Sequence, residues 1–318
     1  MKKLLALVLA VCMLLACTSS LAESKVYHIG ILQLMQHNAL DAATKGFRDA
    51  LTDLLGAENV VFDEQNAQGD SAQCSTIATG FVANGYDLIM ANATPALLAC
   101  MNATDTIPIL GTSVTDYASA MDYDTVEGGT GINVCGTSDG VIASMYVDCV
   151  LEIVPDAKKV AITYCSAEPN SKVQADNFIA AMEPYGVECV VGTFADFNDM
   201  QAVIAATIDG CDALYIPTDN TAASNMTAVA NVCIAAGMPV ITGEENMMAQ
   251  GGLATVSISY YGLGYTTGKM AYDILVNGAD IKTMEIQYAE TLVKEYNAEN
   301  AEAIGITIPE GYTAYAAE

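Results

Sequence analysis

Two stretches of the sequence, GYDLIMANATPA (Gly85–Ala96) and GCDALYIPTDNTA (Gly210–Ala222), follow one pattern. Each begins at a glycine, continues through an apolar run typical of a buried strand, and ends in polar residues just before a helix-like segment. The next strand-like segments also correspond, because IPILGTS from Ile107 matches MPVITGE from Met238. The chain therefore contains two copies of one structural unit.

The alternation of apolar patterns predicts what this unit is. The segment VYHIGILQL (Val26–Leu34) is typical of a strand, and from Leu40 to Leu54 apolar residues then recur three and four positions apart, as on one face of a helix. Strand-like and helical segments keep alternating in both halves. Such alternation predicts a parallel sheet with helices on both faces. We therefore expect an α/β fold of two doubly wound parallel-sheet lobes that face each other across a cleft.

The composition fits two domains and excludes one class of partner. The chain has 318 residues, of which 53% are hydrophobic, and this is more apolar material than one small core requires. Its 38 acidic and 11 basic residues give a formal net charge of −27. That charge repels nucleic-acid phosphates and anionic lipid headgroups. Nucleic acid is therefore not expected as a partner.

The first 24 residues have the pattern of an export signal. Two lysines precede an uninterrupted apolar stretch, Leu4–Ala16, that is too short to span a bilayer. LLAC, which ends at Cys17, looks like a bacterial lipobox, in which the cysteine is lipidated. We expect an exported lipoprotein on the outer side of the cell membrane, with residues 1–24 as signal peptide and lipid-anchor tether. Cleavage after SLA, which ends at Ala22, is the alternative.

The remaining cysteines are spaced unlike metal ligands. Eight follow Cys17, and none forms a CxxC motif or a cluster with histidine, so we expect no metal site. They lie singly in apolar segments, where cysteine acts as a small hydrophobic residue, and we expect free thiols. Because an even number in an exported chain also suits disulfides, that alternative stays open.

The predicted architecture also indicates where a ligand binds. In open parallel sheets, ligands lie beyond the carboxyl ends of the strands, where loops lead into helix N-termini with unpaired N–H groups. In this chain each such loop is polar, although the strand before it is apolar. The candidate ligand-binding residues are Gln33, His37, Asn92, Thr94, Thr112, Thr115 and Asp116 in lobe one, and Ser166, Glu168, Asn170, Ser171, Asp219, Asn220 and Glu244 in lobe two.

The pair Asp219 and Asn220 indicates what kind of ligand to expect. Only one of the two can cap the following helix, so the other polar group is available to a ligand. In lobe one, Thr94 as N-cap and Pro95 as first helical residue would leave N–H groups suited to a carboxylate. A carboxylate-binding lobe one opposite an ammonium-binding Asp219 or Glu168 describes an amino-acid site.

Motifs spread over most of the chain point to one family. QHNALDAATKGFRDAL, NAQGD, ANATPA, VTD, AEPNSKVQ, IPTDNT and SYYGLGYTTGKMAYDIL occur between about residues 26 and 305. Together they closely resemble the bacterial ABC-transporter substrate-binding lipoproteins that include tryptophan-binding members. Cys135 replaces a threonine common in that family, and YCSAEPNS replaces a more usual YNPGEANS in a cleft loop. The second change leaves the identity of the ligand open.

The resemblance implies a type I periplasmic-binding-protein fold, whose two lobes are joined by a three-segment hinge and close on the ligand. Lobe one is expected to comprise residues 25–133 and 254–280, and lobe two residues 134–253 and 281–318. The implied function is the capture of a small molecule, an amino acid with aromatic ones among the candidates. A monomer without a cofactor would deliver it to an ABC permease and its ATPase, and would touch the membrane only through the lipid anchor.

Two other functions are consistent with parts of the sequence. GLGYTTG (Gly262–Gly268) loosely resembles a dinucleotide-binding motif of an enzyme, but its spacing is GxGxxxG and no strand-end acid follows it. Close helix packing explains such small residues as well. A lipid-anchored sensor for a signalling receptor would share the fold and all the site residues. We expect a binding protein and not an enzyme, with the sensor as the alternative.

Overall fold

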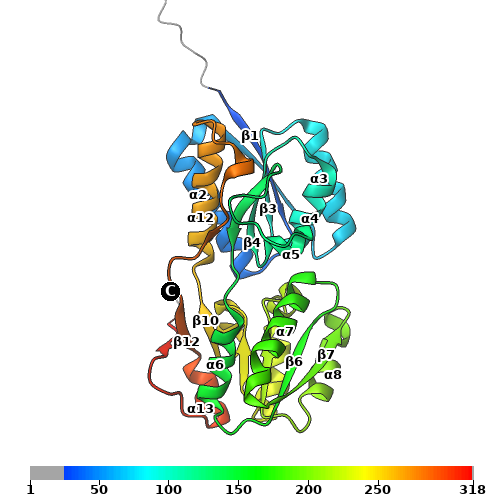
Figure 1. Cartoon of the computed structure of the whole chain (residues 1–318), viewed down its shortest axis with the longest axis vertical. Coiled ribbons are helices and arrows are strands. Elements are labelled where there is room, and N and C mark those ends of the chain that lie inside the picture. Colours follow the sequence, from blue (N-terminus) through cyan, green and yellow to red (C-terminus); the bar gives the residue numbers. More distant parts are fainter. Residues whose placement is uncertain (1–24, 317–318) are drawn as a thin grey trace, which may run out of the picture.

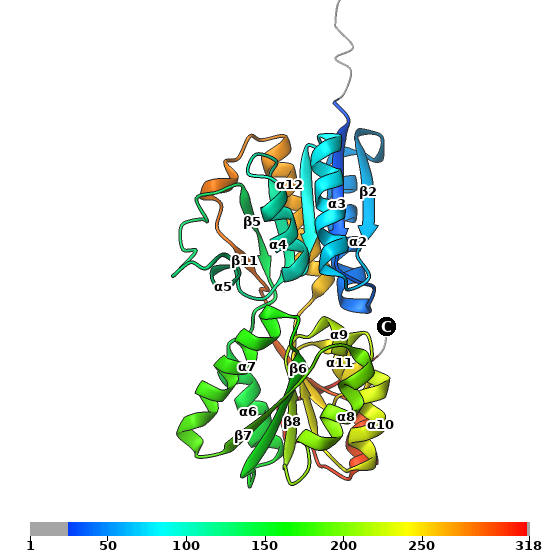
Figure 2. The ribbon, with the colours of Figure 1, turned by 90° about the vertical axis from the view of Figure 1, so that its right-hand side faces the viewer.

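The computed structural model describes residues 25–316, which form two lobes. The lobes lie one above the other in Figure 1, and Figure 2 shows the same division from a direction at right angles. The predicted signal peptide and Cys17 lie outside the described residues. The N-terminal strand begins the upper lobe, called lobe one, and the lower lobe is lobe two.

Lobe one is built on a sheet with the strand order β11-β5-β4-β3-β1-β2, in which all neighbours are parallel. Its strands are β1 (Tyr27–Gln33), β2 (Val60–Asn66), β3 (Leu88–Asn92), β4 (Ile109–Val114), β5 (Val134–Ser138) and β11 (Gln287–Tyr288). Its helices are α2 (Asn38–Leu55), α3 (Ser71–Asn84), α4 (Thr94–Ala103), α5 (Tyr117–Met121) and α12 (Tyr260–Leu275). Every residue of β3 and β4 is buried, as expected when helices cover both faces.

Lobe two is built on a sheet with the order β13-β12-β10-β9-β8-β6-β7. Its strands are β6 (Lys159–Cys165), β7 (Glu188–Phe194), β8 (Ala213–Ile216), β9 (Val240–Thr242), β10 (Ala254–Ser257), β12 (Val293–Tyr296) and β13 (Thr313–Ala314). Its helices are α6 (Ala143–Ile153), α7 (Pro169–Met182), α8 (Phe197–Thr207), α9 (Asn220–Ala223), α10 (Met226–Ala235), α11 (Glu245–Gln250) and α13 (Ala298–Ile304). Strands β10 and β12 pair antiparallel, and the other neighbours are parallel.

The internal repeat predicted from the sequence is present in both sheets. Strand β3 lies between β1 and β4, and β8 lies in the corresponding place between β6 and β9. Each lobe also has its own apolar core. Phe47 and Phe81 are buried in lobe one, and in lobe two Phe178 stacks on Tyr215 with ring centroids 4.2 Å apart. Separate cores allow the lobes to move as two bodies.

Three chain segments join the lobes, as in a type I periplasmic-binding-protein fold, so the predicted fold class is confirmed. The chain crosses from β5 to α6, from β10 to α12, and from β11 to β12. The predicted boundaries need correction, because they assign β5 and β11 to lobe two and β10 to lobe one. Strand β5 pairs with β4, β11 pairs with β5, and β10 pairs with β9. Each strand completes its sheet before the chain crosses, so each crossover follows the strand's carboxyl end.

Two glycines of the GLGYTTG motif, Gly264 and Gly268, pack α12 against α2. A Cβ atom added at Gly264 would lie 1.9 Å from the carbonyl oxygen of Ala43, and one at Gly46 would lie 2.1 Å from that of Tyr261. No side chain fits at such distances, so glycine is required where the two backbones approach. This packing accounts for the motif without a dinucleotide.

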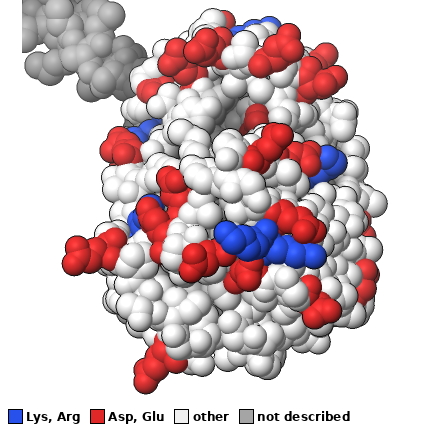
Figure 3. Space-filling view, turned by 60° about the horizontal axis from the view of Figure 1, so that its bottom comes forward, with Lys and Arg blue, Asp and Glu red and all other residues white. Residues whose placement is uncertain are grey.

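The acidic composition is visible on the surface. In Figure 3, which brings the lower end of the molecule forward, Asp and Glu side chains are spread over the face and Lys and Arg are few. Within residues 25–316, no helix is both long and apolar enough to cross a bilayer, and no group of three or more potential metal ligands occurs. The eight cysteines of the same segment are unpaired. Burial raises the pKa of the Cys74 thiol to about 11.

Candidate functional site

A cavity lies between the lobes, at the strand ends where the sequence places the site. Six of the predicted residues line it, namely His37, Thr115, Asn170, Asp219, Asn220 and Glu244. The cavity is about 10 Å3, which is room for about one water molecule. A ligand of amino-acid size therefore requires the lobes to move apart before it enters.

Two of the predicted site residues, His37 and Asn220, form a hydrogen bond between the lobes. Nε2 of His37, just before α2, lies 3.1 Å from Oδ1 of Asn220, the first residue of α9. Burial lowers the pKa of His37, while the bond to Asn220 and the charge of Asp41 oppose this effect, so the ring is held in its neutral form. A second contact between the lobes runs from the Ser224 hydroxyl to the sulfur of Met35, at 3.0 Å. The cleft is thus closed by direct side-chain contacts.

Glu168 holds the start of α9 with both carboxylate oxygens. Oε2 accepts from the backbone and side-chain nitrogens of Asn220, at 2.9 and 2.6 Å. Oε1 accepts from the backbone nitrogen and the hydroxyl of Thr221, at 2.8 and 2.9 Å. The residue is 4% exposed and does not line the cavity. Its oxygens are already occupied by protein donors.

Asp219 is the N-cap of α9 and is fully buried. Its Oδ1 accepts from the backbone nitrogen of Ala222 at 2.8 Å, and Oδ2 accepts from that of Cys165 at 2.7 Å. Burial, followed by the charge of Glu168, raises the pKa of Asp219. The structure therefore gives Asp219 the capping role, and its contact with a ligand ammonium stays a prediction.

Glu244 plays the corresponding part for α11. Its Oε1 accepts from the backbone nitrogen of Met247 at 2.6 Å, and Oε2 accepts from that of Asn246 at 2.7 Å. Burial raises the pKa of Glu244 to about 7, although these backbone donors favour the charged form. The carboxylates at the strand ends of lobe two thus stabilise helix N-termini, whose unpaired N–H groups attract negative charge.

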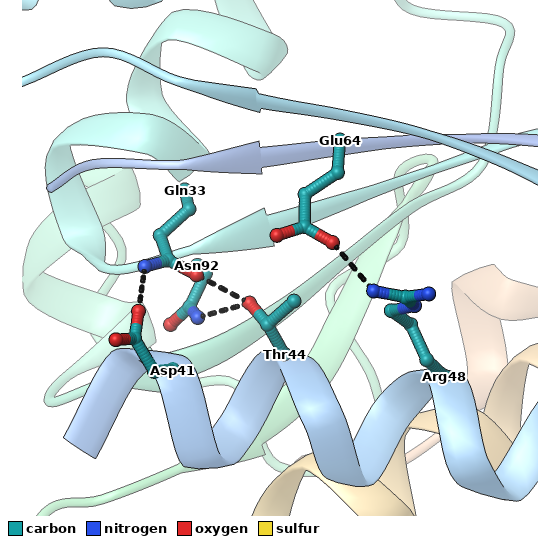
Figure 4. Close-up of polar contacts among 6 residues, drawn as sticks. All are labelled: Gln33, Asp41, Thr44, Arg48, Glu64 and Asn92. Atoms are coloured by element: carbon teal, nitrogen blue, oxygen red, sulfur yellow. Dashed lines mark hydrogen bonds and ion pairs between the residues drawn. The ribbon is translucent and has the colours of Figure 1, made fainter. Parts of the chain in front are cut away.

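The predicted residues Gln33 and Asn92 belong to a network inside lobe one, shown in Figure 4. Nε2 of Gln33 donates to Asp41 at 2.6 Å, and its Oε1 accepts from the Thr44 hydroxyl at 2.6 Å. Nδ2 of Asn92 donates to Thr44 at 3.0 Å and to the carbonyl of Leu40 at 2.8 Å. These bonds join β1 and β3 to α2. Neither Gln33 nor Asn92 lines the cavity.

Of the other predicted residues of lobe one, Thr115 lines the cavity, and Thr94, Thr112 and Asp116 do not. Thr112 Oγ1 is 3.1 Å from the hydroxyl of Thr137, and Asp116 caps α5 by accepting from Ser119. Thr94 is the first residue of α4 and not its N-cap. That place belongs to Ala93, whose φ of 90° supplies the turn without a side-chain bond. The predicted N-cap at Thr94 is therefore wrong by one residue.

In lobe two, Ser166 and Ser171 are both tied to backbone groups. The Ser166 hydroxyl donates to the carbonyl of Phe194 at 3.2 Å, and that of Ser171 donates to the carbonyl of Thr218 at 3.3 Å. Thr218 itself lines the cavity, as do Ser113 and the two residues on the crossovers, Asp139 and Tyr260.

The sequence did not predict Asp139 and Tyr260 as site residues. The strands before them, β5 and β10, lie outside the segments that were recognised as repeated. Asp139 comes just after β5 on the first crossover, and Tyr260 begins α12 after the second. The Tyr260 hydroxyl donates to Oδ2 of Asp139 at 2.8 Å. Burial raises the pKa of Asp139, whereas the hydroxyls of Tyr260 and Thr115 lower it. The feature that marks Asp139 as a site residue is its buried carboxylate on a segment that connects the lobes. The sequence does not show that the residue is buried, so it could not identify Asp139.

With two lobes, three crossovers and a polar cavity between strand ends, the molecule has the architecture of a solute-binding protein that closes on its ligand. The family model described as "ABC transporter substrate binding protein" matches residues 28–318. The chain belongs to this family, and the predicted resemblance is confirmed. It is therefore a substrate-binding protein of the ABC-transporter class.

Three relatives are similar over most of their length. A "Tyrosine-binding protein" of Clostridioides difficile (strain R20291) is 35% identical over 277 residues, which are 86% of this chain and 80% of the relative. The structure of an ABC domain in complex with L-Trp from Streptococcus pneumoniae has 31% identity and a TM-score of 0.85, covering 90% of this chain and 97% of that one.

The third relative is the ligand-free, open structure of CD0873, a substrate-binding protein with adhesive properties from Clostridium difficile. It has 36% identity and covers 92% of this chain and 100% of that one, but its TM-score is 0.70. The open structure is thus more similar in sequence than the L-Trp complex and superposes less well. This order is expected when the lobes of the present chain are closed.

Proposed function

We propose that this protein captures an amino acid with an aromatic or large apolar side chain between its lobes and delivers it to a membrane permease driven by an ATPase. The observation that carries the proposal is the cavity itself, which both lobes and two crossovers line with polar groups at the strand ends. Leu40, Ala223 and Met247 add an apolar part to the same lining. Methionine sulfur packs favourably against aromatic rings.

The relatives support this choice of ligand class. One is named for tyrosine and another was solved with L-Trp. Both ligands combine an ammonium, a carboxylate and an aromatic ring. The cavity residues offer polar partners for the first two and apolar partners for the third.

A thermal-shift screen of the mature protein against the twenty common amino acids tests the proposal. Binding to the folded form alone stabilises it by about 2.7 kcal/mol at a hundredfold excess over the dissociation constant. We expect L-tyrosine or L-tryptophan to give the largest rise in melting temperature, with D-glucose as the negative control. Titration calorimetry then gives the stoichiometry, expected to be one ligand per monomer. Flat curves with every amino acid would refute the proposal.

The proposed site of action is the outer side of the cell membrane, with Cys17 as the lipid anchor. Replacing Cys17→Ala should move the protein from the membrane fraction to the soluble fraction of the exported material. Retention of the variant in the membrane fraction would exclude the anchor. Delivery to a permease is tested separately, by measuring uptake of the radiolabelled amino acid in cells that lack the protein. Unchanged uptake would favour the sensor function.

A further inference from the structure

Four buried side-chain atoms that line the cleft cavity lack a hydrogen-bond partner within residues 25–316. Three of them act as acceptors, namely Nδ1 of His37, Oδ1 of Asp139 and Oδ1 of Asn170, and the fourth, the hydroxyl oxygen of Ser113, can accept or donate. They come from different parts of the molecule: lobe one, the first crossover and α7 of lobe two. Buried polar atoms are nearly always paired, because an unpaired one costs free energy. The three acceptors among them indicate a ligand group that donates hydrogen bonds.

The acceptor character of His37 Nδ1 follows from its neighbours. The side-chain nitrogen of Asn220 donates to Glu168, so the other amide atom, facing His37, is the oxygen. Nε2 of His37 must then carry the proton that is donated to this oxygen. In the neutral ring the second nitrogen, Nδ1, is therefore an acceptor.

The orientation of the Asn170 amide is fixed in the same way. Its Nδ2 donates to the carbonyl oxygen of Thr218 at 2.9 Å, which leaves Oδ1 as the free acceptor. The residue is 6% exposed. Because Nδ2 is held by a backbone group, the amide cannot turn over without losing that bond.

Asp139 differs from the other carboxylates of the cleft. Asp219 and Glu244 line the cavity too, but each uses both oxygens to accept from backbone nitrogens. Asp139 is 3% exposed, its Oδ2 accepts from Tyr260, and the nearby Thr115 hydroxyl lowers its pKa, but its Oδ1 has no hydrogen-bond partner. Its Oδ1 is thus the carboxylate oxygen of the cavity that remains available for a ligand.

We propose that Asp139, together with His37 and Asn170, receives the ammonium group of the ligand. A primary ammonium carries three donors and no acceptor, which matches three acceptors and no competing cation. The carboxylate supplies the opposite charge, and charge-assisted bonds are the stronger ones. The proposal rests on the proposed amino-acid function and moves the ammonium site from Asp219 to the crossover.

Ammonium recognition is first tested on the unmodified protein by titration calorimetry. L-Tyrosine is compared with 3-(4-hydroxyphenyl)propionate, and L-tryptophan with indole-3-propionate, because each second compound lacks only the amino group. We expect at least a hundredfold weaker binding of the compounds without the amino group, since they leave three buried acceptors unpaired. Equal affinity for both members of a pair overturns the inference. Failure of both amino acids to bind would instead remove the proposed function.

Variants then locate the ammonium site. Asp139→Asn should weaken binding of the amino acid at least tenfold and leave the affinity for the analogue without the amino group unchanged. Asp219→Asn is the rival variant and should keep the preference for the amino acid, and Asp196→Asn, on the exposed N-cap of α8, is the remote control. Loss of the preference in Asp219→Asn, with retention in Asp139→Asn, overturns the assignment.

A purely structural role of Asp139 gives a different result. If the carboxylate only braces Tyr260, Asp139→Asn and Tyr260→Phe should weaken both compounds of a pair equally, and that outcome contradicts the inference. Should Asp139→Asn not fold, Asp139→Glu keeps the charge and lengthens the side chain. This variant is expected to lose affinity for the amino acid more than for the analogue, and an equal loss for both compounds overturns the inference.

Discussion

The polar layers at the strand ends of the two lobes are built from different chemistry. In lobe one, neutral side chains dominate, and Gln33, Thr44 and Asn92 bond mainly to one another and to α2 (Figure 4). In lobe two, the carboxylates of Glu168 and Asp219 bond to the start of α9. Apart from the bond from Gln33 to the carboxylate of Asp41, the neutral amides of lobe one bond to neutral groups, whereas a buried charge needs several strong donors, which helix N-termini provide.

This difference explains why polar residues after a strand do not always belong to the ligand site, although the sequence pattern is similar in both lobes. In both lobes, most polar groups after the strands stabilise the lobe that carries them. The cavity atoms left for a ligand are acceptors on His37, Asn170 and the crossover residue Asp139, and the hydroxyl of Ser113. Because the carboxylates are concentrated in the polar layer of lobe two, we expect charge and pH to affect the stability of lobe two more than that of lobe one.

The largest expected effect is that of Glu168→Gln. The variant loses a buried charge that accepts four hydrogen bonds from Asn220 and Thr221, and its amide nitrogen would face one of their donors. We expect the free energy of unfolding in urea to fall by about 3 kcal/mol. Glu183→Gln, an exposed change in the same lobe, is the control. Equal transition midpoints for the two variants would show that the carboxylate is dispensable.

The second effect is a pH dependence due to Glu244, whose pKa rises from 4.5 to about 7 on folding. Between these values the folded state binds more protons than the unfolded state, so stability falls as the pH rises. Relative to Glu244→Gln, the unmodified protein should lose about 3 kcal/mol of unfolding free energy between pH 4.5 and 8. The lowered pKa of His37 acts in the opposite direction but is common to both proteins. Parallel pH curves for the two proteins would contradict the assignment.

A smaller loss is expected in lobe one from Thr44→Val. The hydroxyl of Thr44 donates to Gln33 and accepts from Asn92, and the isosteric valine leaves both amides short of a partner. We expect a loss of about 1.5 kcal/mol that is independent of pH between 5 and 8, because no titrating group is removed. Thr76→Val on the exposed side of α3 is the control. A strong pH dependence of the loss would break the contrast between the lobes.

The smallest effect belongs to the ion pair of Arg48 and Glu64, in the right half of Figure 4. Nη1 of Arg48 lies 3.1 Å from Oε2 of Glu64, with side-chain exposures of 51% and 43%. Because water screens such pairs, Arg48→Met should change the free energy of unfolding by about 0.5 kcal/mol or less. A loss larger than that of Thr44→Val would reverse the order proposed for lobe one.

Much of the fold could be predicted because its signals are local. The apolar runs and helical periods along the chain define the strands and helices, and the repeat of Gly85–Ala96 at Gly210–Ala222 implies two lobes. The lobe boundaries were less predictable. Whether a strand such as β5 joins the sheet before or after a crossover depends on which distant strand it pairs with.

The sequence alone determined that polar groups follow the strands and that these groups face a cleft between two similar lobes. Only the tertiary structure decided which of their atoms are already used. The bond between His37 and Asn220 spans 183 residues, and the bond between Tyr260 and Asp139 spans 121. Hydrogen bonding in a buried site is settled by such distant partners, since each donor or acceptor must be satisfied where the chain brings it. A sequence pattern shows which polar groups are present, but it does not show which hydrogen-bond partners they have in the folded protein.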